Sequence, residues 1–204
     1  METLTDLSVA DDWQLVDQAR KGNEEAYAQL ISRHQEAIHA FVYRHVGDAE
    51  SARDLTQEVF IRAWFALERV RVSARFTTWL FQIAINLCRD YAKSKTTRQN
   101  RVTDPIVRLD KEGAEGEREL PDPAVRPDEQ AQWNEAMHAL EAEIARLPLE
   151  LREAFILGAV QGHPQKDVAI MLGLSPKAVE VRIYRARQRL TEQLAVLGHI
   201  RDKN

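Results

Sequence analysis

The stretch that most constrains the fold runs from residue 163 to residue 190 and reads HPQKDVAIMLGLSPKAVEVRIYRARQRL. Its spacing is typical of a helix-turn-helix, in which two short helices share one small core. Ala169 is small where the two helices cross, and Gly173 follows four residues later, where the turn favours a positive backbone angle. Ser175 caps the second helix and Pro176 fits its first turn. This pattern predicts a small all-helical domain.

The second helix of this motif has an apolar face and a charged face. Val179, Ile183, Ala186 and Leu190 recur at spacings of four, three and four, so they point into the domain. The first residues of such a helix reach base edges, and later ones hold phosphates. We therefore assign four residues to bases: Lys177, Glu180, Val181 and Arg182. Three are assigned chiefly to phosphates, Arg185, Arg187 and Arg189, and the candidate DNA-binding set also includes Ser175 and Tyr184. The alternative is a charged solvent face on a packing helix.

Helical patterning also fills the first ninety-odd residues, where apolar side chains recur every three or four positions with almost no strand-like alternation. We expect four helices there. Asp11 or Asp12 caps the first, Asn23 the second and Asp48 the third. The fourth runs from about residue 76 to residue 95. These helices predict an all-α first domain.

The helical periodicity of apolar residues is lost between the two helical parts. Residues 98–128 hold four of the seven prolines and many charges but few apolar side chains, which is typical of a flexible linker. We therefore predict an all-α chain of two small helical domains, residues 1–97 and residues 129–204. The linker joins them, and the second domain carries the helix-turn-helix.

Charge alternates along the chain. Residues 1–70 carry a net charge of −6, residues 71–101 of +6, residues 102–145 of −8 and residues 146–204 of +4, within a total of −4. Two basic blocks that alternate with two acidic ones predict separate surfaces for a polyanion and for other proteins. Ordinary solvated helix faces are the alternative.

Cysteine usage and hydropathy narrow the cellular setting. Cys88 is the only cysteine, so we expect no internal disulfide and no paired metal ligands, and its apolar surroundings predict a buried thiol in a reducing cytoplasm. The first residues, METLTDLSVADDW, are acidic and lack the apolar core of a signal peptide. No apolar run approaches the ~20 residues that span a bilayer, which predicts no membrane insertion.

The fourth predicted helix, FTTWLFQIAINLCRDYAKSK, mixes aromatic side chains with a basic end. Aromatic rings beside cations suit single-stranded nucleic acid, whose bases stack on rings while its phosphates lie among positive charges. Trp79, Leu80, Ile83, Leu87 and Tyr91 fit one buried stripe. Phe81 and Asn86 lie off this stripe in the sequence pattern and are the better candidates for binding a base, because an amide both donates and accepts.

These segments together resemble the extracytoplasmic-function sigma factors, the minimal two-domain bacterial transcription initiation factors. DAESARDLTQEVFIRAW is similar to their region 2.2, FTTWLFQIAINLCRDYAKSK to their regions 2.3 to 2.4, and residues 147–190 to their region 4. The resemblance covers nearly everything except the linker. It implies a factor that binds core RNA polymerase, recognises the minus-thirty-five and minus-ten promoter elements, and promotes DNA opening.

The resemblance also implies roles for particular residues. The third helix would dock on the clamp helices of the largest polymerase subunit through Asp54, Gln57, Glu58, Phe60, Ile61 and Trp64, and region 4 would meet the flap of the second largest subunit. The opened non-template strand of the minus-ten element would be held by Arg75, Thr78, Phe81, Asn86, Arg89, Lys93 and Lys95. Region 4 would read the minus-thirty-five element as duplex. The family's usual Lys or Arg followed by Ser is replaced here by Glu180 and Val181, which implies an altered preference.

Three other functional classes are the alternatives to a sigma factor. A conventional DNA-binding regulator, whose first domain senses a ligand or dimerises, would bind promoter duplex without polymerase, and a pure protein-interaction adaptor would not depend on DNA. An enzyme finds little support, because the six histidines lack ligand spacing and no phosphate loop or nucleophile elbow is present. We therefore expect no cofactor, metal or catalytic residue. The resemblance further implies an anti-sigma factor as a partner, which in some relatives holds the sigma factor at the membrane.

Overall fold

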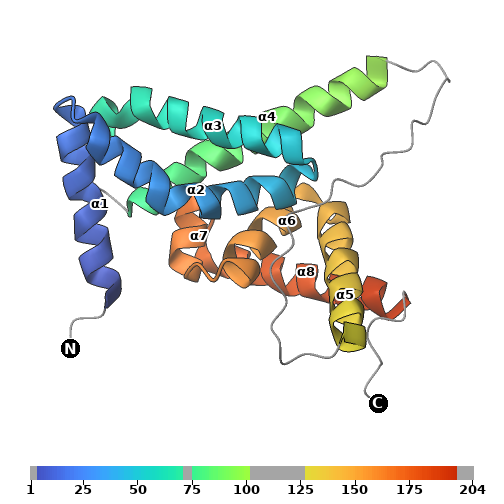
Figure 1. The fold of residues 1–204 in the computed structure, drawn as a ribbon. Coiled ribbons are helices and arrows are strands. Elements are labelled where there is room, and N and C mark those ends of the chain that lie inside the picture. The colour runs from blue at the N-terminus through green and yellow to red at the C-terminus, as the bar shows by residue number, and fades with distance from the viewer. Residues whose placement is uncertain (1–3, 71–74, 102–126, 197–204) are drawn as a thin grey trace.

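The computed structural model describes residues 4–70, 75–101 and 127–196, and every element in these ranges is helical (Figure 1). The first part holds α1 (Leu4–Arg20), α2 (Glu24–Val46), α3 (Ala49–Ala66), the short turn η1 (Leu67–Arg69) and α4 (Phe76–Arg101). The second part holds α5 (Pro127–Arg146), α6 (Leu149–Phe155), the π-helical stretch η2 (Ile156–Val160), α7 (Gln165–Leu172) and α8 (Pro176–Val196). The all-α prediction is confirmed.

Helix α2 is the centre of the first domain, packed against α1, α3 and α4. Local signals set its ends as the sequence predicts. The Asn23 side chain accepts a hydrogen bond from the Ala26 amide at 3.2 Å, and Gly47 ends the helix in the left-handed conformation with φ 72°. Asp48 caps α3 by accepting from the Ser51 amide at 2.9 Å.

The start of α1 differs from the prediction. This helix begins at Leu4, and Asp12 is a buried residue inside it rather than a cap. The Asp12 carboxylate lies 2.9 Å from His34 Nε2 and accepts from Arg33 at 3.1 Å, so it ties α1 to α2. Burial alone would raise the pKa of Asp12, but the hydrogen bonds and charges of His34 and Arg33 outweigh burial and lower it. A tertiary ion pair has replaced the expected cap.

Helix α4 ends at Arg101, later than the predicted Lys95, and α5 begins at Pro127. Most of the predicted linker, residues 102–126, lies outside the described residues. The exact domain boundaries, at residues 97, 98, 128 and 129, therefore stay predictions.

The helix-turn-helix of the second domain forms from α7 and α8. Gly173 ends α7 with φ 68°, and Ser175 Oγ accepts from the Ala178 amide at 3.2 Å, as predicted for the turn and the cap. The four apolar residues assigned to the inner face of α8, Val179, Ile183, Ala186 and Leu190, are all buried. A Cβ on Gly158 of η2 would come within 2.5 Å of Ile183 Cδ1, so glycine allows η2 to approach α8 closely.

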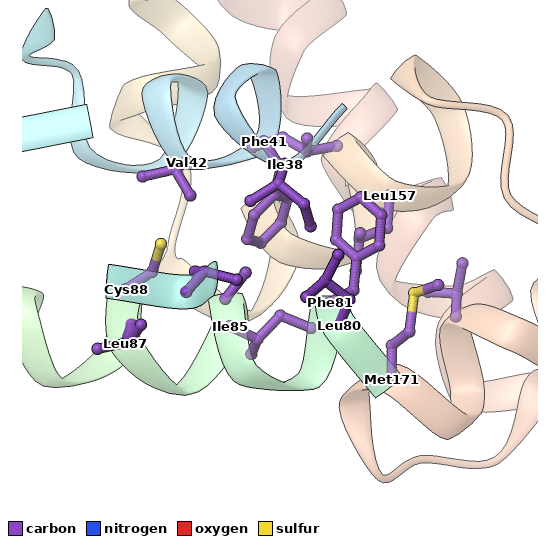
Figure 2. Close-up of a cluster of buried hydrophobic side chains, with 14 of the residues drawn as sticks. Ile38, Phe41, Val42, Leu80, Phe81, Ile85, Leu87, Cys88, Leu157 and Met171 are labelled. Atoms are coloured by element: carbon purple, nitrogen blue, oxygen red, sulfur yellow. The ribbon is translucent and has the colours of Figure 1, made fainter. Parts of the chain in front are cut away.

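The two parts share one hydrophobic core, in which α4 packs on α7 (Figures 1 and 2). Figure 2 shows Leu157 and Met171 of the second part beside Phe41, Leu80 and Phe81 of the first. Cys88 is buried in the same cluster as predicted, and desolvation together with the charge of Glu153 raises the pKa of its thiol to about 12. The second domain therefore lies directly against the fourth helix of the first.

Candidate nucleic-acid and protein interfaces

Helix α8 presents the predicted DNA-binding residues in two stripes, because residues three, four and seven apart share a face of a helix. One stripe lines a hollow of about 520 Å³ between η2, the start of α7 and α8, and consists of Lys177, Glu180, Val181, Tyr184 and Arg187. All five side chains are exposed. The Lys177 ammonium pairs with the Glu180 carboxylate at 3.0 Å, and Gln188 donates to the Tyr184 hydroxyl at 3.0 Å. This stripe therefore lies open to solvent.

The other stripe holds Arg182, Arg185 and Arg189 and lies toward α6. Arg182 donates to the Glu150 carboxylate at 2.9 Å and is only 23% exposed, so it differs from the outward base reader that the sequence predicts. Arg185 and Arg189 are exposed and border a second hollow at the start of α6. Ser175 caps α8, which leaves its hydroxyl engaged with backbone. Arg182 is therefore held by its own domain.

Helix α4 contrasts with α8, because the second domain covers part of it. Phe81 was expected off the buried stripe, yet it is fully buried (Figure 2). Its ring meets Phe41 edge-on at 5.6 Å and His163 at 4.9 Å. Thr78 is also buried, whereas Trp79, Ile83 and Tyr91 of the expected stripe remain partly exposed. The sequence pattern missed the burial of Phe81 because part of its cover, the His163 side chain, comes from the second domain.

Two arginines of the predicted minus-ten set are paired with carboxylates of the second domain. Arg89 donates from Nε and Nη2 to the two carboxylate oxygens of Glu153, at 2.8 and 2.7 Å. Arg75 lies 3.6 Å from the Asp167 carboxylate. Asn86, Lys93 and Lys95 of α4 are exposed. The structure therefore leaves these three side chains open to solvent and pairs Arg75 and Arg89 with the second domain.

Glu153 is the most buried carboxylate in these contacts, with 1% of its side chain exposed. His45 Nε2 of α2 lies 3.7 Å from Glu153 Oε1, and Arg89 completes the surroundings from α4. Burial raises the pKa of Glu153, but His45 and Arg89 lower it by more, so the pKa stays below its usual range. Glu153 is therefore an ionised carboxylate at neutral pH.

A third candidate surface is an open groove of about 990 Å³ between α2 and α3. Four of the residues predicted to bind polymerase line it: Gln57, Phe60, Ile61 and Trp64. Its floor is set by Tyr27, whose ring packs on Trp64 at 4.7 Å and whose hydroxyl donates to the Phe60 carbonyl. The other two predicted residues, Asp54 and Glu58, lie outside the groove lining, and Glu58 pairs with Arg62 at 2.6 Å.

The groove also contains residues that the sequence analysis missed. Phe65 is 78% exposed at the edge of the groove, and Ile31 of α2 lines the opposite wall. Phe65 follows Ile61 by four positions, which places both on one face of α3. That spacing is the signal in the sequence that identifies Phe65. Exposed apolar side chains around a hollow mark a protein-binding surface.

The described part of the chain contains no group of three or more histidine, cysteine, aspartate or glutamate side chains that could hold a metal ion. Within the same residues, no helix has the length and apolar character needed to cross a membrane.

Both helical parts of the chain match known protein families. Residues 30–98 match the family model described as sigma-70 region 2, and residues 137–190 match that of sigma-70 region 4. The RNA polymerase sigma-H factor of Pseudomonas aeruginosa is 31% identical over 94% of this chain and 97% of its own. The ECF RNA polymerase sigma factor SigW of Bacillus subtilis is 28% identical over 88% of this chain and 94% of its own.

The fold is also similar to a solved structure, that of CnrH in complex with the cytosolic domain of CnrY. The TM-score is 0.63 at 29% identity, and the match covers 91% of this chain and 98% of CnrH. The chain therefore belongs to the sigma-70 family, in its extracytoplasmic-function group. Sigma factors bind RNA polymerase and recognise promoters at the start of transcription, so the protein is a transcription initiation factor and not a member of a known enzyme family.

Proposed function

We propose that this sigma factor uses three separate surfaces: the α2–α3 groove for core polymerase, α8 for duplex DNA, and α4 for the opened strand. It carries no catalytic residue of its own in this scheme. The observation that carries the proposal is the groove, because exposed apolar side chains around a hollow mark a surface that binds another protein, and most of its lining lies in the residues that match sigma-70 region 2. The groove and α8 belong to different domains.

In the groove, the clamp helices of the largest polymerase subunit would pack on Ile61 and Phe65. These side chains are 46% and 78% exposed, so docking would remove apolar surface from water. Asp54 and Glu58 lie beside the groove on α3, where they would contribute polar contacts at its rim. The second domain would meet the flap of the second largest subunit.

For the minus-thirty-five element, the exposed stripe of α8 would enter the major groove. Glu180 would accept a hydrogen bond from a cytosine amino group, and Val181 would pack on a thymine methyl. Both side chains lie in the same hollow as Lys177 and Arg187, which supports reading by one face. If Glu180→Lys left relative transcription from a panel of minus-thirty-five variants unchanged, this assignment would be wrong.

For the minus-ten element, Asn86 would bind a base flipped from the non-template strand, with Lys93 and Lys95 beside the backbone. Unstacking a base costs a few kcal/mol, so a pocket that holds it selects sequence as it stabilises opening. The exposure of Asn86 and the two lysines supports this role. Arg75, Thr78, Phe81 and Arg89 would join them once uncovered.

An inhibitory partner is also proposed. CnrH is solved with a separate chain, the cytosolic domain of CnrY, and is similar to this protein over nearly its whole length. A cognate anti-sigma factor would bind this sigma factor in a comparable way and keep it from polymerase, in the cytoplasm or at the membrane surface. Co-purification of the protein with the product of a neighbouring gene would test this.

Reconstituted transcription tests the main proposal. The protein is mixed with bacterial core polymerase and a genomic promoter library, and transcripts are sequenced. Promoter-specific transcripts are expected from the wild type and a strong loss from Ile61→Arg, which places a charge in the groove. Glu50→Ala, an exposed change on the same helix outside the groove lining, is the matched control. Absence of specific transcripts across the library would overturn the proposal.

A further inference from the structure

The second domain places carboxylates on the two arginines that the proposed function assigns to opened DNA. Glu153 of α6 holds Arg89 through two hydrogen bonds, and Asp167 of α7 pairs with Arg75. A carboxylate that accepts two parallel hydrogen bonds from a guanidinium matches a DNA phosphate in charge and in geometry. A phosphate cannot occupy the same face of Arg89 while Glu153 holds it.

Apolar contacts cover the part of α4 around Leu80 and Phe81. His163 lies against the Phe81 ring at 4.9 Å, and Leu157 and Met171 belong to the core cluster that encloses Leu80 (Figure 2). Phe81 is fully buried in this position, so no base can reach it. The cover therefore keeps a base away from Phe81 and competes with a DNA phosphate for Arg89.

Hydrogen bonds to backbone fix the position of the cover. Gln82 donates to the Ile170 carbonyl at 2.9 Å, and Gln161 donates to the Ala37 carbonyl at 2.7 Å. Arg152, next to Glu153, donates to the carbonyl of His45 at 2.8 Å. These contacts join α2 and α4 to the second domain at several points, so the arrangement is specific rather than a loose collapse.

We propose that this closed arrangement is an autoinhibited state, in which Glu153 and Asp167 occupy the arginine sites of the opened minus-ten strand. The closed arrangement is defined by the contacts of α6 and α7 with α4. It rests on the proposed function, because it takes α4 to be the DNA-binding helix. Opening uncovers Arg75, Phe81 and Arg89 together, and binding of polymerase or DNA to the open form shifts the population toward it.

The closed arrangement leaves the other two proposed binding surfaces accessible. The α2–α3 groove and the reading stripe of α8 stay exposed while Phe81 is buried and Arg89 is held by Glu153. Polymerase docking and minus-thirty-five contact can therefore begin on the closed form, and only the step that holds opened DNA must wait. We call the two pairs Glu153–Arg89 and Asp167–Arg75 the latch. The latch delays capture of the opened strand but does not delay the search for a promoter.

Glu153→Gln tests the latch, because it keeps the shape of the side chain and removes its charge. The readouts are the radius of gyration by small-angle X-ray scattering and the affinity for a fluorescein-labelled pool of random single-stranded 20-mers. We expect a larger radius and about tenfold tighter binding, since removing one partner of a buried ion pair shifts the balance strongly toward the open form. Glu192→Gln, an exposed change on α8, should match the wild type.

A charge swap distinguishes opening of the two domains from misfolding of the variant. Glu153→Arg should enlarge the radius, and adding Arg89→Glu should restore the compact radius while circular dichroism shows unchanged helix content. A wild type that already scatters as two separate domains, or a Glu153→Gln variant with wild-type radius and affinity, would overturn the latch. The proposed function fails on a different readout, the absence of promoter-specific transcripts with core polymerase.

Discussion

Helices α8 and α4 are both basic in sequence and both predicted to bind DNA, but their basic side chains differ in exposure and in the origin of their ion-pair partners. The reading stripe of α8 is exposed, and its ion pair joins Lys177 to Glu180 on the helix itself. On α4, the partner of Arg89 is Glu153 from the other domain, and that carboxylate is 1% exposed. A basic face is therefore available to DNA only where its cations lack a buried partner elsewhere in the chain.

The energies of the two kinds of pair explain why this matters. An exposed pair such as Lys177–Glu180 contributes about 0.2–1 kcal/mol and exchanges readily with a phosphate. Removing one partner from a buried pair costs about 3–5 kcal/mol because a charge is left without compensation. Since about a third of the Arg89 side chain is exposed, the lower end of that range applies to its pair with Glu153. DNA must offset this cost on α4 but not on α8.

The largest effect is expected from truncating one aromatic ring on each helix. Phe81→Ala removes a fully buried ring from the shared core and should lower the free energy of unfolding by about 3–5 kcal/mol. Tyr184→Ala on α8 removes a ring that is 61% exposed and should change stability by less than about 0.5 kcal/mol while weakening duplex binding. Urea denaturation of both variants measures the difference. Equal stabilities would show that α4 is not covered in solution.

The sequence predicted the local features of both helices because their causes lie within a few residues. The Ser175 cap, the Gly173 turn and the buried face of α8 each depend on neighbours along the chain. The burial of Phe81 and the pairing of Arg89 depend on residues 82 and 64 positions away, across a segment that gave no periodic signal. Helical periodicity reports which face is apolar, but not which domain covers it.

The groove shows the same limit within one domain. The sequence located four of its lining residues on α3, but its other wall is α2, whose contribution depends on how the two helices pack. Asp12 was misread as a cap for a related reason, since its partners His34 and Arg33 lie on the next helix. Tertiary ion pairs and grooves are set by packing that a single sequence does not display.

The cap of α8 offers a smaller effect. Ser175→Ala removes the side-chain acceptor for the Ala178 amide and should lower stability by about 1 kcal/mol. Asn23→Ala, at the cap of α2, is the matched change in the first domain. If the domains unfold as one closed unit, both variants should shift a single urea transition. Two transitions, of which each variant moves only one, would show that the domains are uncoupled and would weaken the contrast between α8 and α4.

The salt dependence of duplex DNA binding should also distinguish α8 from α4. Arg185 is exposed on α8, so Arg185→Ala should reduce by about one the number of counterions released when a minus-thirty-five duplex binds. Arg89→Ala should leave that slope unchanged, because Arg89 is engaged by Glu153 and lies on the other helix. Titrations of labelled duplex over a range of salt concentrations measure both slopes. A reduced slope for Arg89→Ala would place α4 on duplex DNA and contradict its assignment to the opened strand.

The smallest expected effect is a loosening of the cover on α4 in mild acid. Burial lowers the pKa of His163 below its usual 6.5, with Arg75 acting in the same direction and Asp167 opposing both. In the open form His163 has its usual pKa, so it binds a proton as the pH falls below about 6.5, whereas in the closed form it does so only at lower pH. The closed form is therefore most stable above pH 6.5 and loses stability as the pH falls toward the lowered pKa. The pKa of Glu153 lies below its usual 4.5, so it contributes only at lower pH.

Scattering at pH 7.5 and pH 5.5 should therefore show a modest increase in the radius of gyration of the wild type. His163→Phe keeps a ring against Phe81 but does not titrate, so its radius should be the same at both pH values. Meanwhile, duplex binding by α8 should show no matching change from this histidine, since His163 contacts α4 and not the reading stripe. If the radius of His163→Phe increased in acid as much as that of the wild type, the acid response would come from another group. His163 would then not be the group that loosens the cover on α4.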